Sequence, residues 1–500
     1  MPAGYICSAG RDFLRRGGGC GIFRQDFPVP GRILLPGIEV IALQRKTVKV
    51  DMTQGRIFPL VLRFALPLCI GNILQQLYST VDMLVIGNYC GATALAAVGT
   101  SSQPVEMFLC LFMGLGTGVT ILVSQSTGSG DQARQRVVVR NATVFLYLCA
   151  LPLTVLGVCF GPLLLRLMQA PADTWDMAVS YIRILFLGTL GNLGYNVNAG
   201  ILRGVGDSNS SLLFLLISCL VNIVLDLVLV AGLGMDVSGA AWATIIAMYI
   251  SWLISMVYIR RRYPELGYSP IPHGADRQAL RDIARVSIPL GLNHSFYSVG
   301  HLFLQTLINA QGSIFMAACT VGSKVNGLAN VAINALSSAG TTFAGQNLGA
   351  QRYDRLARGG WRIPLFSGMI TLAAALVVTV FARPILRLFN DDPQVLALAL
   401  RFVRIVTPSL SAFAVFNGII AFVNGMGIMT YPTIVNILML WAVRIPVAYL
   451  IDALGAGLYV MASFPISFCF GMLVMLCFFL TPRWRGICAK ARMQREGQTV

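Results

Sequence analysis

Three acidic residues lie inside long apolar stretches of this 500-residue chain: Asp82, Glu106 and Asp226. An ionisable residue inside a membrane span costs at least about 2.5 kcal/mol on insertion scales, so each needs a partner or a function. The apolar stretches of the second half hold basic residues instead, namely Lys324, Arg401, Arg404 and Arg444. The few charges within the apolar segments therefore form two groups of opposite sign.

The spacing of Asn222 and Asp226 predicts a cation site. The two residues are four positions apart, so on a helix their side chains share one face. Counting along the apolar stretches places Asp82 and Asp226 in the outer half of the membrane. Two carboxylates that share a cavity of low dielectric disfavour a double charge, so at least one could take up and release a proton near neutral pH. With Asn and Thr oxygens nearby, the same cage could hold Na⁺, which also prefers hard oxygen ligands.

Each of these residues also has a structural interpretation. Asp82 and Asp226 could cap a neighbouring helix, or pair with a buried base such as Arg183. Glu106 follows Pro104 near the start of a span, a position that favours a helix-terminal or pairing role over transport.

The basic, histidine and aromatic residues leave similar alternatives open. Lys324 could face a cavity in the second half or be a paired structural charge. His294 and His301 share one helix face, as core residues or as a proton relay. The aromatic residues could line a pathway for organic cations, although ordinary packing is the default role. They are Tyr78, Tyr195, Phe296, Tyr297 and Phe416.

The elements that must position these residues are membrane helices. Hydrophobic residues make up 56% of the chain and charged residues only 11%, against a usual quarter, which nearly excludes a water-soluble enzyme. Stretches of about 20 apolar residues recur often enough for twelve spans. Because these stretches are too long and too evenly apolar for barrel strands, we predict an all-α polytopic bundle. The spans lie near 62–86, 97–123, 141–161, 177–202, 212–233, 239–259, 286–310, 316–342, 363–383, 395–424, 433–453 and 456–480.

The basic residues between the spans predict the orientation. They crowd one set of loops and the C-terminal tail, whereas the loops on the other side hold only Arg166, Arg383 and Arg387. The positive-inside rule then places both termini in the cytoplasm, in a cell (inner) membrane. The net charge of +17 is therefore mostly a topology signal with some contact to anionic lipid, and no nucleic-acid partner is expected.

The two halves of the chain are related by an internal repeat. Gln125 and Gln346 differ by 346 − 125 = 221 positions. The same offset relates Gly128 to Gly349, Arg134 to Arg355, Arg166 to Arg387, Arg183 to Arg404, Gly204 to Gly425 and Gly206 to Gly427. Six spans followed by six similar spans form a parallel repeat, which suits alternating access and hence a transporter. A duplicated membrane scaffold is the alternative, but it has no need for buried polar groups.

The repeat sets the predicted domain boundaries. We expect a first lobe at 52–259, a linker at 260–285, a second lobe at 286–482 and a basic tail at 483–500. Residues 1–51 are either a disordered basic tail or an extension ahead of a start at Met52, and the second interpretation is favoured. The twelve cysteines show no metal-binding spacing and mostly fall within spans, as small buried hydrophobic residues do.

Several runs resemble the multidrug and toxic compound extrusion (MATE) transporters. They are Leu66-Pro67, Gln75-Gln76-Leu77-Tyr78 with Asp82, the segment from Ala199 to Asp207, Asn222 to Asp226, and Thr342 to Gly349. The match extends over roughly 52–485. The resemblance implies two six-helix bundles that rock between inward- and outward-facing states, and efflux of drugs coupled to H⁺ or Na⁺ entry.

The resemblance also implies site residues. One branch of the family has its cation site in the first lobe, and here the matching residues are Asp82, Asn222, Asp226, Asn196 or Asn198, and Thr244, with Na⁺ possible at Asp82 and Asp226. Another branch uses carboxylates in spans 7 and 10, where this sequence has Asn293, His294, Asn417 and Asn424 instead. A carboxylate site in the second lobe is therefore not expected. We expect Gln76, Tyr78, Tyr297, Lys324 and Asn417 to line the substrate cleft.

Together these features predict a monomeric antiporter that exports amphiphilic, often cationic, organic compounds against H⁺ or Na⁺, without a cofactor. A flippase for lipid-linked saccharides is the alternative. It would need a cationic cleft to bind the phosphate of its substrate, and Lys324 and Arg444 could supply that charge. A membrane enzyme would need a clustered acid or a metal constellation at the interface. Asp391-Asp392-Pro393 is the only acidic pair, and it is more typical of a helix start.

Overall fold

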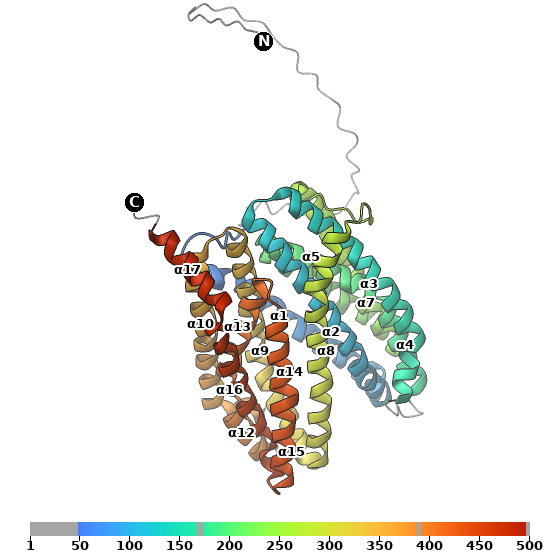
Figure 1. Cartoon of the computed structure of the whole chain (residues 1–500). Helices are drawn as coiled ribbons and strands as arrows, with labels where there is room; N and C mark the ends of the chain where they lie inside the picture. The colour runs from blue at the N-terminus through green and yellow to red at the C-terminus, as the bar shows by residue number, and fades with distance from the viewer. Residues whose placement is uncertain (1–48, 168–173, 388–391, 497–500) are drawn as a thin grey trace, which may run out of the picture. The chain divides into compact units, whose positions relative to one another are not determined.

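A computed structural model describes residues 49–167, 174–387 and 392–496 of the chain. All the regular structure in these residues is helical (Figure 1). The first half contains α1 (Ile57–Tyr89), α2 (Gly91–Ser129), α3 (Gln132–Leu167), α4 (Trp175–Leu187), α5 (Thr189–Val205), α6 (Ser208–Asp226), the π-helical turn η1 (Leu227–Gly232) and α7 (Asp236–Arg262). A short 3₁₀ turn, η2 (Pro264–Leu266), follows.

The second half repeats this order. It contains α8 (Arg277–Ala310), α9 (Ser313–Gly349), α10 (Tyr353–Val380), α11 (Ala382–Arg387), α12 (Pro393–Val406), α13 (Leu410–Gly425), α14 (Thr430–Ile437), the π-helical turn η3 (Leu438–Arg444), α15 (Ile445–Ala453), η4 (Gly457–Ala462), α16 (Ser463–Leu476), η5 (Cys477–Leu480) and α17 (Pro482–Glu496). Each predicted span falls within one helix or one run of adjoining helices, so the predicted helical bundle is confirmed.

Two predicted spans are bent. The span at 177–202 is the pair α4 and α5, which meet at 44°, and the span at 395–424 is the pair α12 and α13, which meet at 47°. Among the described residues, seven helices are long and apolar enough to cross a membrane, or nine when each bent pair counts as one span. The other three predicted spans lie in α2, α8 and α9, which are each longer than a bilayer requires.

α2 of the first lobe and α8 of the second lobe approach each other closely. A Cβ added at Gly114 of α2 would lie 2.2 Å from the backbone nitrogen of Gly291 in α8. At Gly118, one turn further, it would lie 2.1 Å from the hydroxyl of Ser287. Such close approach needs small residues rather than large apolar ones. These helices therefore face protein along much of their length, and a purely apolar surface is not required of them.

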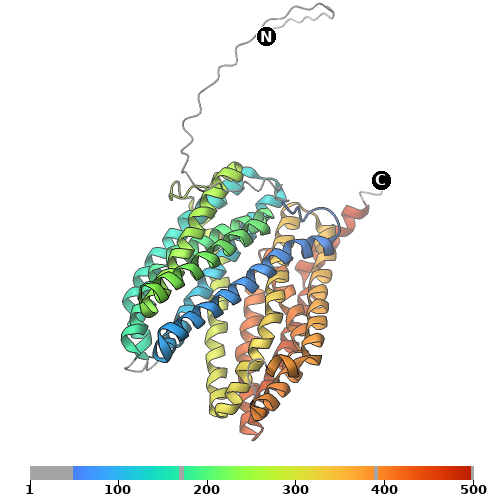
Figure 2. The ribbon, with the colours of Figure 1, turned by 180° about the vertical axis from the view of Figure 1, so that it is seen from behind.

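α1 joins the hydrophobic cores of both lobes. Near its start, Val61 and Phe64 pack in a core with Phe343 and Phe416 of the second lobe. Near its end, Val85 and Ile86 pack with residues of α4 and α7 in the first lobe. Figure 2 shows α1, in blue, running obliquely from the orange helices toward the green ones. The first span therefore connects the lobes instead of belonging to one alone.

The connecting segments differ in length from those predicted. α7 ends at Arg262 and α8 begins at Arg277, where the Asp276 side chain accepts hydrogen bonds from the backbone N–H groups of Gln278 and Ala279. The linker is thus 263–276 rather than 260–285, because both helices continue beyond their apolar stretches. Most of the predicted tail is helical, as α17.

Two further predictions fall partly outside the described residues. The prediction for 1–51 lies almost wholly there, although Val50 and Met52 are described and buried. In the predicted acidic pair, Asp391 lies outside, whereas Asp392 caps α12 by accepting a hydrogen bond from the backbone N–H of Gln394. A helix start is therefore the role that the structure gives to Asp392.

Candidate functional site

Two acidic side chains meet in the first lobe. Asp82 comes from α1, and Asp226 is the last residue of α6. Their carboxyl groups face each other closely enough for one, when protonated, to donate a hydrogen bond to the other. Asp226 is fully buried. Two residues that are 144 positions apart in the chain (226 − 82) therefore form one candidate site, as the sequence predicts.

The oxygens of this acid pair have no donor among the described protein groups. Oδ1 of Asp82 and both carboxylate oxygens of Asp226 are buried without a hydrogen-bond partner. The alternative of pairing with Arg183 has no support, since the described residues contain one ion pair between side chains, Arg358 with Asp354. Buried charges without partners are costly, so this site favours a proton or a small cation.

Asp207, a second fully buried acid of the first lobe besides Asp226, shows the contrast. Its carboxylate accepts hydrogen bonds from the hydroxyls of Ser210 at 2.7 Å, Tyr258 at 3.2 Å and Tyr263 at 2.8 Å. It also accepts from the backbone N–H of Ser210 at 3.0 Å, where it caps α6. A buried carboxylate with four donors is a satisfied structural group. The missing donors at Asp82 and Asp226 are therefore specific to the acid pair.

Asn222 and Thr244 supply further oxygens. One helical turn before Asp226, the Asn222 amide donates a hydrogen bond to the Thr244 hydroxyl at 3.4 Å, and its own Oδ1 has no partner. Both residues line a narrow crevice with Tyr78. The pair α6 and α7 thus supplies the oxygen-bearing side chains that the sequence predicts beside Asp226.

The hydrogen bonds of Asn196 and Asn198 go to residues outside the acid pair. The Asn196 amide donates to the backbone and side-chain oxygens of Asn192, both at 2.9 Å. The buried Asn198 amide donates to the Ser255 hydroxyl at 2.8 Å. Oδ1 of Asn198, like the oxygens of the acid pair, is buried without a hydrogen-bond partner, so a place for either asparagine at the cation site stays a prediction.

Of the residues predicted to line the substrate cleft, some border a crevice or cavity and others do not. Tyr78 borders the crevice beside Asn222, whereas Gln76 is exposed on α1. Lys324 is exposed on α9 and does not line the cavity of the second lobe. The side chain of Glu106 lies outside the described residues.

The second lobe contains a cavity of about 360 Å³. Its wall includes the predicted residues Tyr297 and Asn417, both histidines of α8, and aromatic and amide side chains. The residues that line it are His294, Tyr297, His301, Ser323, Asn326, Asn330, Asn334, Phe402, Val406, Leu410, Phe413, Asn417, Asn436, Phe464 and Phe468. None of these carries a carboxylate, which agrees with the expectation that the second lobe has no acidic site.

Arg444 lies directly behind this wall. It is fully buried, and its Nε donates to the Ser467 hydroxyl at 2.8 Å while Nη1 donates to the Tyr297 hydroxyl at 3.1 Å. The guanidinium carbon also lies 4.8 Å and 4.7 Å from the ring centroids of Phe464 and Phe468. Aromatic faces can therefore stabilise a buried cation for which the described residues offer no acid.

The two lobes touch through residues that the repeat relates. The Gln125 amide donates to the backbone carbonyl of Gly425 at 3.1 Å, and the Gln346 amide donates to that of Gly204 at 3.0 Å. These are the same contact made in both directions, because Gln125 corresponds to Gln346 and Gly204 to Gly425. We call this set of residues, with the glycines described next, the lobe joint.

Two equivalent glycines allow the lobe joint to close. A Cβ added at Gly128 would lie 1.9 Å from the carbonyl oxygen of Gln346, and one added at Gly349 would lie 1.9 Å from that of Gln125. The ends of α2 and α9 therefore approach each other closely, at the end of the molecule where α3 and α10 begin.

Comparison with known proteins decides the family. The family model MatE matches residues 67–228 and 289–450, together well over half of the chain. The chain belongs to the MatE family. Because 289 − 67 and 450 − 228 both equal 222, the two matched windows follow the internal repeat to within one residue of its offset of 221.

Individual relatives and solved structures are similar to this chain over most of their length. The chain is 29% identical over 437 residues to the probable multidrug resistance protein YoeA of Bacillus subtilis, covering 83% of this chain and 94% of the relative. Among solved structures, it is similar to a MATE transporter in complex with MaD3S, with a TM-score of 0.81, 25% identity and coverage of 89% and 99%. It is also similar to an outward-facing multidrug resistance MATE transporter, with a TM-score of 0.80, 25% identity and the same coverage. This MatE protein is therefore a multi-pass membrane transporter.

Sequence reasoning missed two features of this MatE protein. The π-helical turn η1 follows Asp226 directly, and η3 ends at Arg444. Such turns are rare and occur often at functional sites. They leave no residue signature that could have revealed them. The partners of Arg444 were also not predicted, although the residue itself was recognised as an intramembrane base.

Proposed function

We propose that this MatE protein is a secondary active exporter of amphiphilic organic compounds, organic cations among them, driven by entry of H⁺ or Na⁺ at Asp82 and Asp226. The observation that supports this most directly is the acid pair, three of whose oxygens are buried without a donor. The distribution of basic residues predicts that the end carrying the lobe joint faces the cytoplasm. An exporter takes up its substrate from that side.

The acid pair can couple a cation to a change of state. When one carboxyl group is protonated, it gains an acceptor in the other, and the charge between α1 and α6 falls. A bound Na⁺ would use the same oxygens together with Oδ1 of Asn222. In either case the ion binds the two conformations unequally, which is what shifts their populations. Because α1 packs in both lobes, a change at Asp82 can reach the second lobe.

The lobe joint supports movement of the lobes as units. Its contacts are a few hydrogen bonds and glycine approaches between equivalent residues, rather than an interlocked core. Rocking of one lobe against the other would break them together. The cavity of the second lobe, with its aromatic and amide wall, offers a surface for an amphiphilic substrate.

The main test is transport of a cationic dye by the full chain in proteoliposomes, with H⁺ and Na⁺ gradients imposed separately. We expect one gradient to drive dye movement and Asp226→Asn to reduce that driven rate at least about a hundredfold, because the variant cannot change charge. Driven transport at full rate by Asp226→Asn would overturn the proposal. Movement of a lipid-linked saccharide in the same vesicles, without dye movement, would favour a flippase instead.

A matched control separates coupling from folding. Asp236→Asn makes the same chemical change at an exposed residue that begins α7, near Asp226 in the chain. We expect this variant to transport dye at the wild-type rate. If both variants lost transport equally, the loss would not be specific to the acid pair.

A further inference from the structure

A cavity of about 660 Å³ lies between the start of α1 and the start of α10. It is at the end of the molecule where the lobe joint lies, and it shares no lining residue with the acid-pair crevice or with the cavity of the second lobe. Its wall contains four arginines, Arg56, Arg355, Arg358 and Arg362, and no acidic residue. We call it the arginine cavity.

One face of α10 changes from basic to apolar along the arginine cavity. Arg355, Arg358 and Arg362 are three and four residues apart, so they share one face of the helix. Leu365 and Met369 continue the same spacing toward the middle of the span, and they also line the cavity. Charge therefore lies at the end of the span, and apolar surface lies at the depth of the hydrocarbon.

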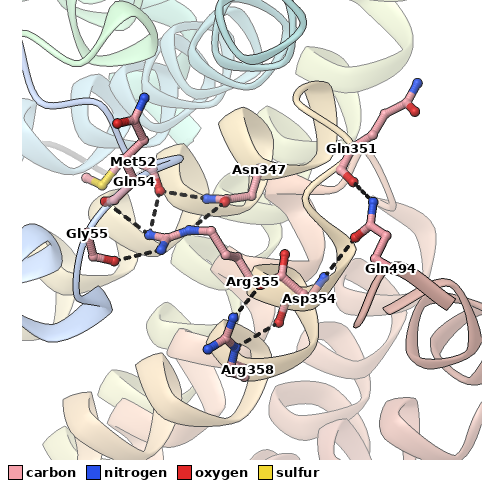
Figure 3. Close-up of polar contacts among 9 residues, drawn as sticks. All are labelled: Met52, Gln54, Gly55, Asn347, Gln351, Asp354, Arg355, Arg358 and Gln494. Carbon is pink, nitrogen blue, oxygen red and sulfur yellow. Dashed lines mark hydrogen bonds and ion pairs between the residues drawn. The ribbon is translucent and has the colours of Figure 1, made fainter. Parts of the chain in front are cut away.

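Two of the four arginines already have partners. Arg355 donates hydrogen bonds to Asn347 Oδ1 at 3.1 Å and to the backbone carbonyls of Met52, Gln54 and Gly55 at 3.0, 3.3 and 2.6 Å (Figure 3). Arg358 forms an ion pair with Asp354. These bonds hold the segment before α1 in place as one wall of the cavity.

The other two arginines are uncompensated. Arg56 and Arg362 are exposed, and within the described part of the chain neither guanidinium has an ion pair or a hydrogen bond. Two cations that face one cavity without a carboxylate produce a strong positive potential there. Such a site favours a ligand with negative charge.

The apolar wall indicates what else the ligand carries. Phe58 is 48% exposed, Leu365 is 61% exposed and Met369 is 60% exposed. The rings of Phe58 and Phe366 meet edge to face with centroids 3.8 Å apart, so α1 and α10 form one continuous apolar surface below the arginines. A free phosphate would leave this surface uncovered, whereas an acyl chain would cover it.

We propose that the arginine cavity binds one anionic phospholipid from the leaflet on this side of the membrane. The phosphate lies between Arg56 and Arg362, because guanidinium groups bind phosphate through paired, charge-assisted hydrogen bonds. One acyl chain follows Phe58, Phe366 and Met369. The lipid thus contacts the first helix of one lobe and a helix of the other. This site does not depend on the proposed coupling mechanism.

Native mass spectrometry of the full-length protein tests the site. We expect the wild-type protein to retain dioleoyl phosphatidylglycerol in preference to dioleoyl phosphatidylcholine, which has the same chains without net charge. The double variant Arg56→Gln/Arg362→Gln should weaken retention of phosphatidylglycerol about thirtyfold, since each basic residue at the surface contributes about a fivefold attraction to anionic lipid. Both side chains are exposed, so the variant should fold normally.

A matched variant distinguishes the cavity from the general positive charge of this end. Arg260→Gln/Arg261→Gln removes the same charge from exposed residues at the end of α7 and should retain the lipid as the wild type does. An equal loss in both double variants would overturn the proposal. Equal retention of the two lipids, or displacement of the lipid by millimolar glycerol 3-phosphate, would also overturn it, the latter by showing a soluble-anion site.

Discussion

In the first lobe, the fifth span changes from α-helix to the π-helical turn η1 immediately after Asp226. In the second lobe, the fifth span contains the π-helical turn η3, which ends at Arg444. Both charged residues are fully buried, and neither has an ion pair in the described structure. Each lobe thus places a buried charge beside a π-helical turn of its fifth span, just before the turn in the first lobe and at the end of the turn in the second.

The surroundings of the two charges differ more than their positions do. The oxygens of Asp226 have no donor, whereas Arg444 has two hydrogen-bond acceptors and two phenylalanine rings, and only its Nη2 lacks a partner. An arginine also stays charged under all ordinary conditions, while a carboxylate can be neutralised. The comparison teaches that charge alone does not identify a coupling residue. Asp226, which is titratable and has no donor at either oxygen, is the one suited to exchange a cation.

The largest effect that tests this contrast is expected at Arg444. Arg444→Ala should lower the free energy of unfolding by about 3 kcal/mol, because it leaves a cavity among Tyr297, Phe464 and Phe468. Arg444→Met fills most of that volume without a charge, and it should leave stability unchanged or raised. Unfolding of the purified protein in detergent, followed by tryptophan fluorescence, measures both.

The transport of the methionine variant completes this test. Since Arg444 is a structural charge in our interpretation, Arg444→Met should keep transport driven by the coupling gradient within about threefold of wild type. Asp226→Asn in the same assay should lose it. If Arg444→Met uncoupled transport as fully as Asp226→Asn does, the contrast between the lobes would be mistaken.

Much of the fold could be predicted because apolar stretches of span length are a strong signal. The ends of the helices were harder to predict. α8 begins at Arg277, nine residues before the predicted span at 286, since its first turns are polar and extend beyond the hydrocarbon. The bends at α4 and α5, and at α12 and α13, are likewise invisible to a pattern that records only apolarity.

The candidate site was predictable where one helix supplies the geometry. A spacing of four placed Asn222 beside Asp226, and both lie at the site. Asn196 and Asn198 were chosen without knowing which face of the fourth span turns toward α1, and their hydrogen bonds go elsewhere. The offset of 221 identified the residues of the lobe joint. The sequence could not show that each glutamine contacts the glycine of the other lobe.

The likeness between the lobes is tested by the two glycines of the lobe joint. Gly128→Ala and Gly349→Ala each place a methyl group 1.9 Å from a backbone oxygen of the other lobe. Each should therefore destabilise the closed lobe joint by about 2 kcal/mol. We expect similar effects from both, because the contacts are equivalent. Hydrogen exchange of the amides at 125–129 and 346–349 should become faster, and transport should fall about tenfold or more.

Each of these helices contains its own control glycine. Among the side chains that the structure describes, none would lie within 4 Å of a Cβ added at Gly99 of α2 or at Gly327 of α9. Gly99→Ala and Gly327→Ala should therefore leave exchange at the lobe joint unchanged. A strong effect of Gly128→Ala together with none of Gly349→Ala would show that the joint is not symmetric in energy.

The smallest expected effects separate the two glutamines, where the symmetry is incomplete. Gln125 donates one hydrogen bond across the joint, whereas Gln346 donates one to Gly204 and also accepts one at 2.9 Å from the backbone N–H of Met52. A buried neutral hydrogen bond contributes about 1 kcal/mol. Gln346→Ala should therefore destabilise the joint by about 2 kcal/mol and Gln125→Ala by about 1 kcal/mol, measured by the same amide exchange. Equal losses would mean that the bond to Met52 adds nothing, and that the segment before α1 is held by its hydrogen bonds with Arg355, Asn347 and Gly206 instead.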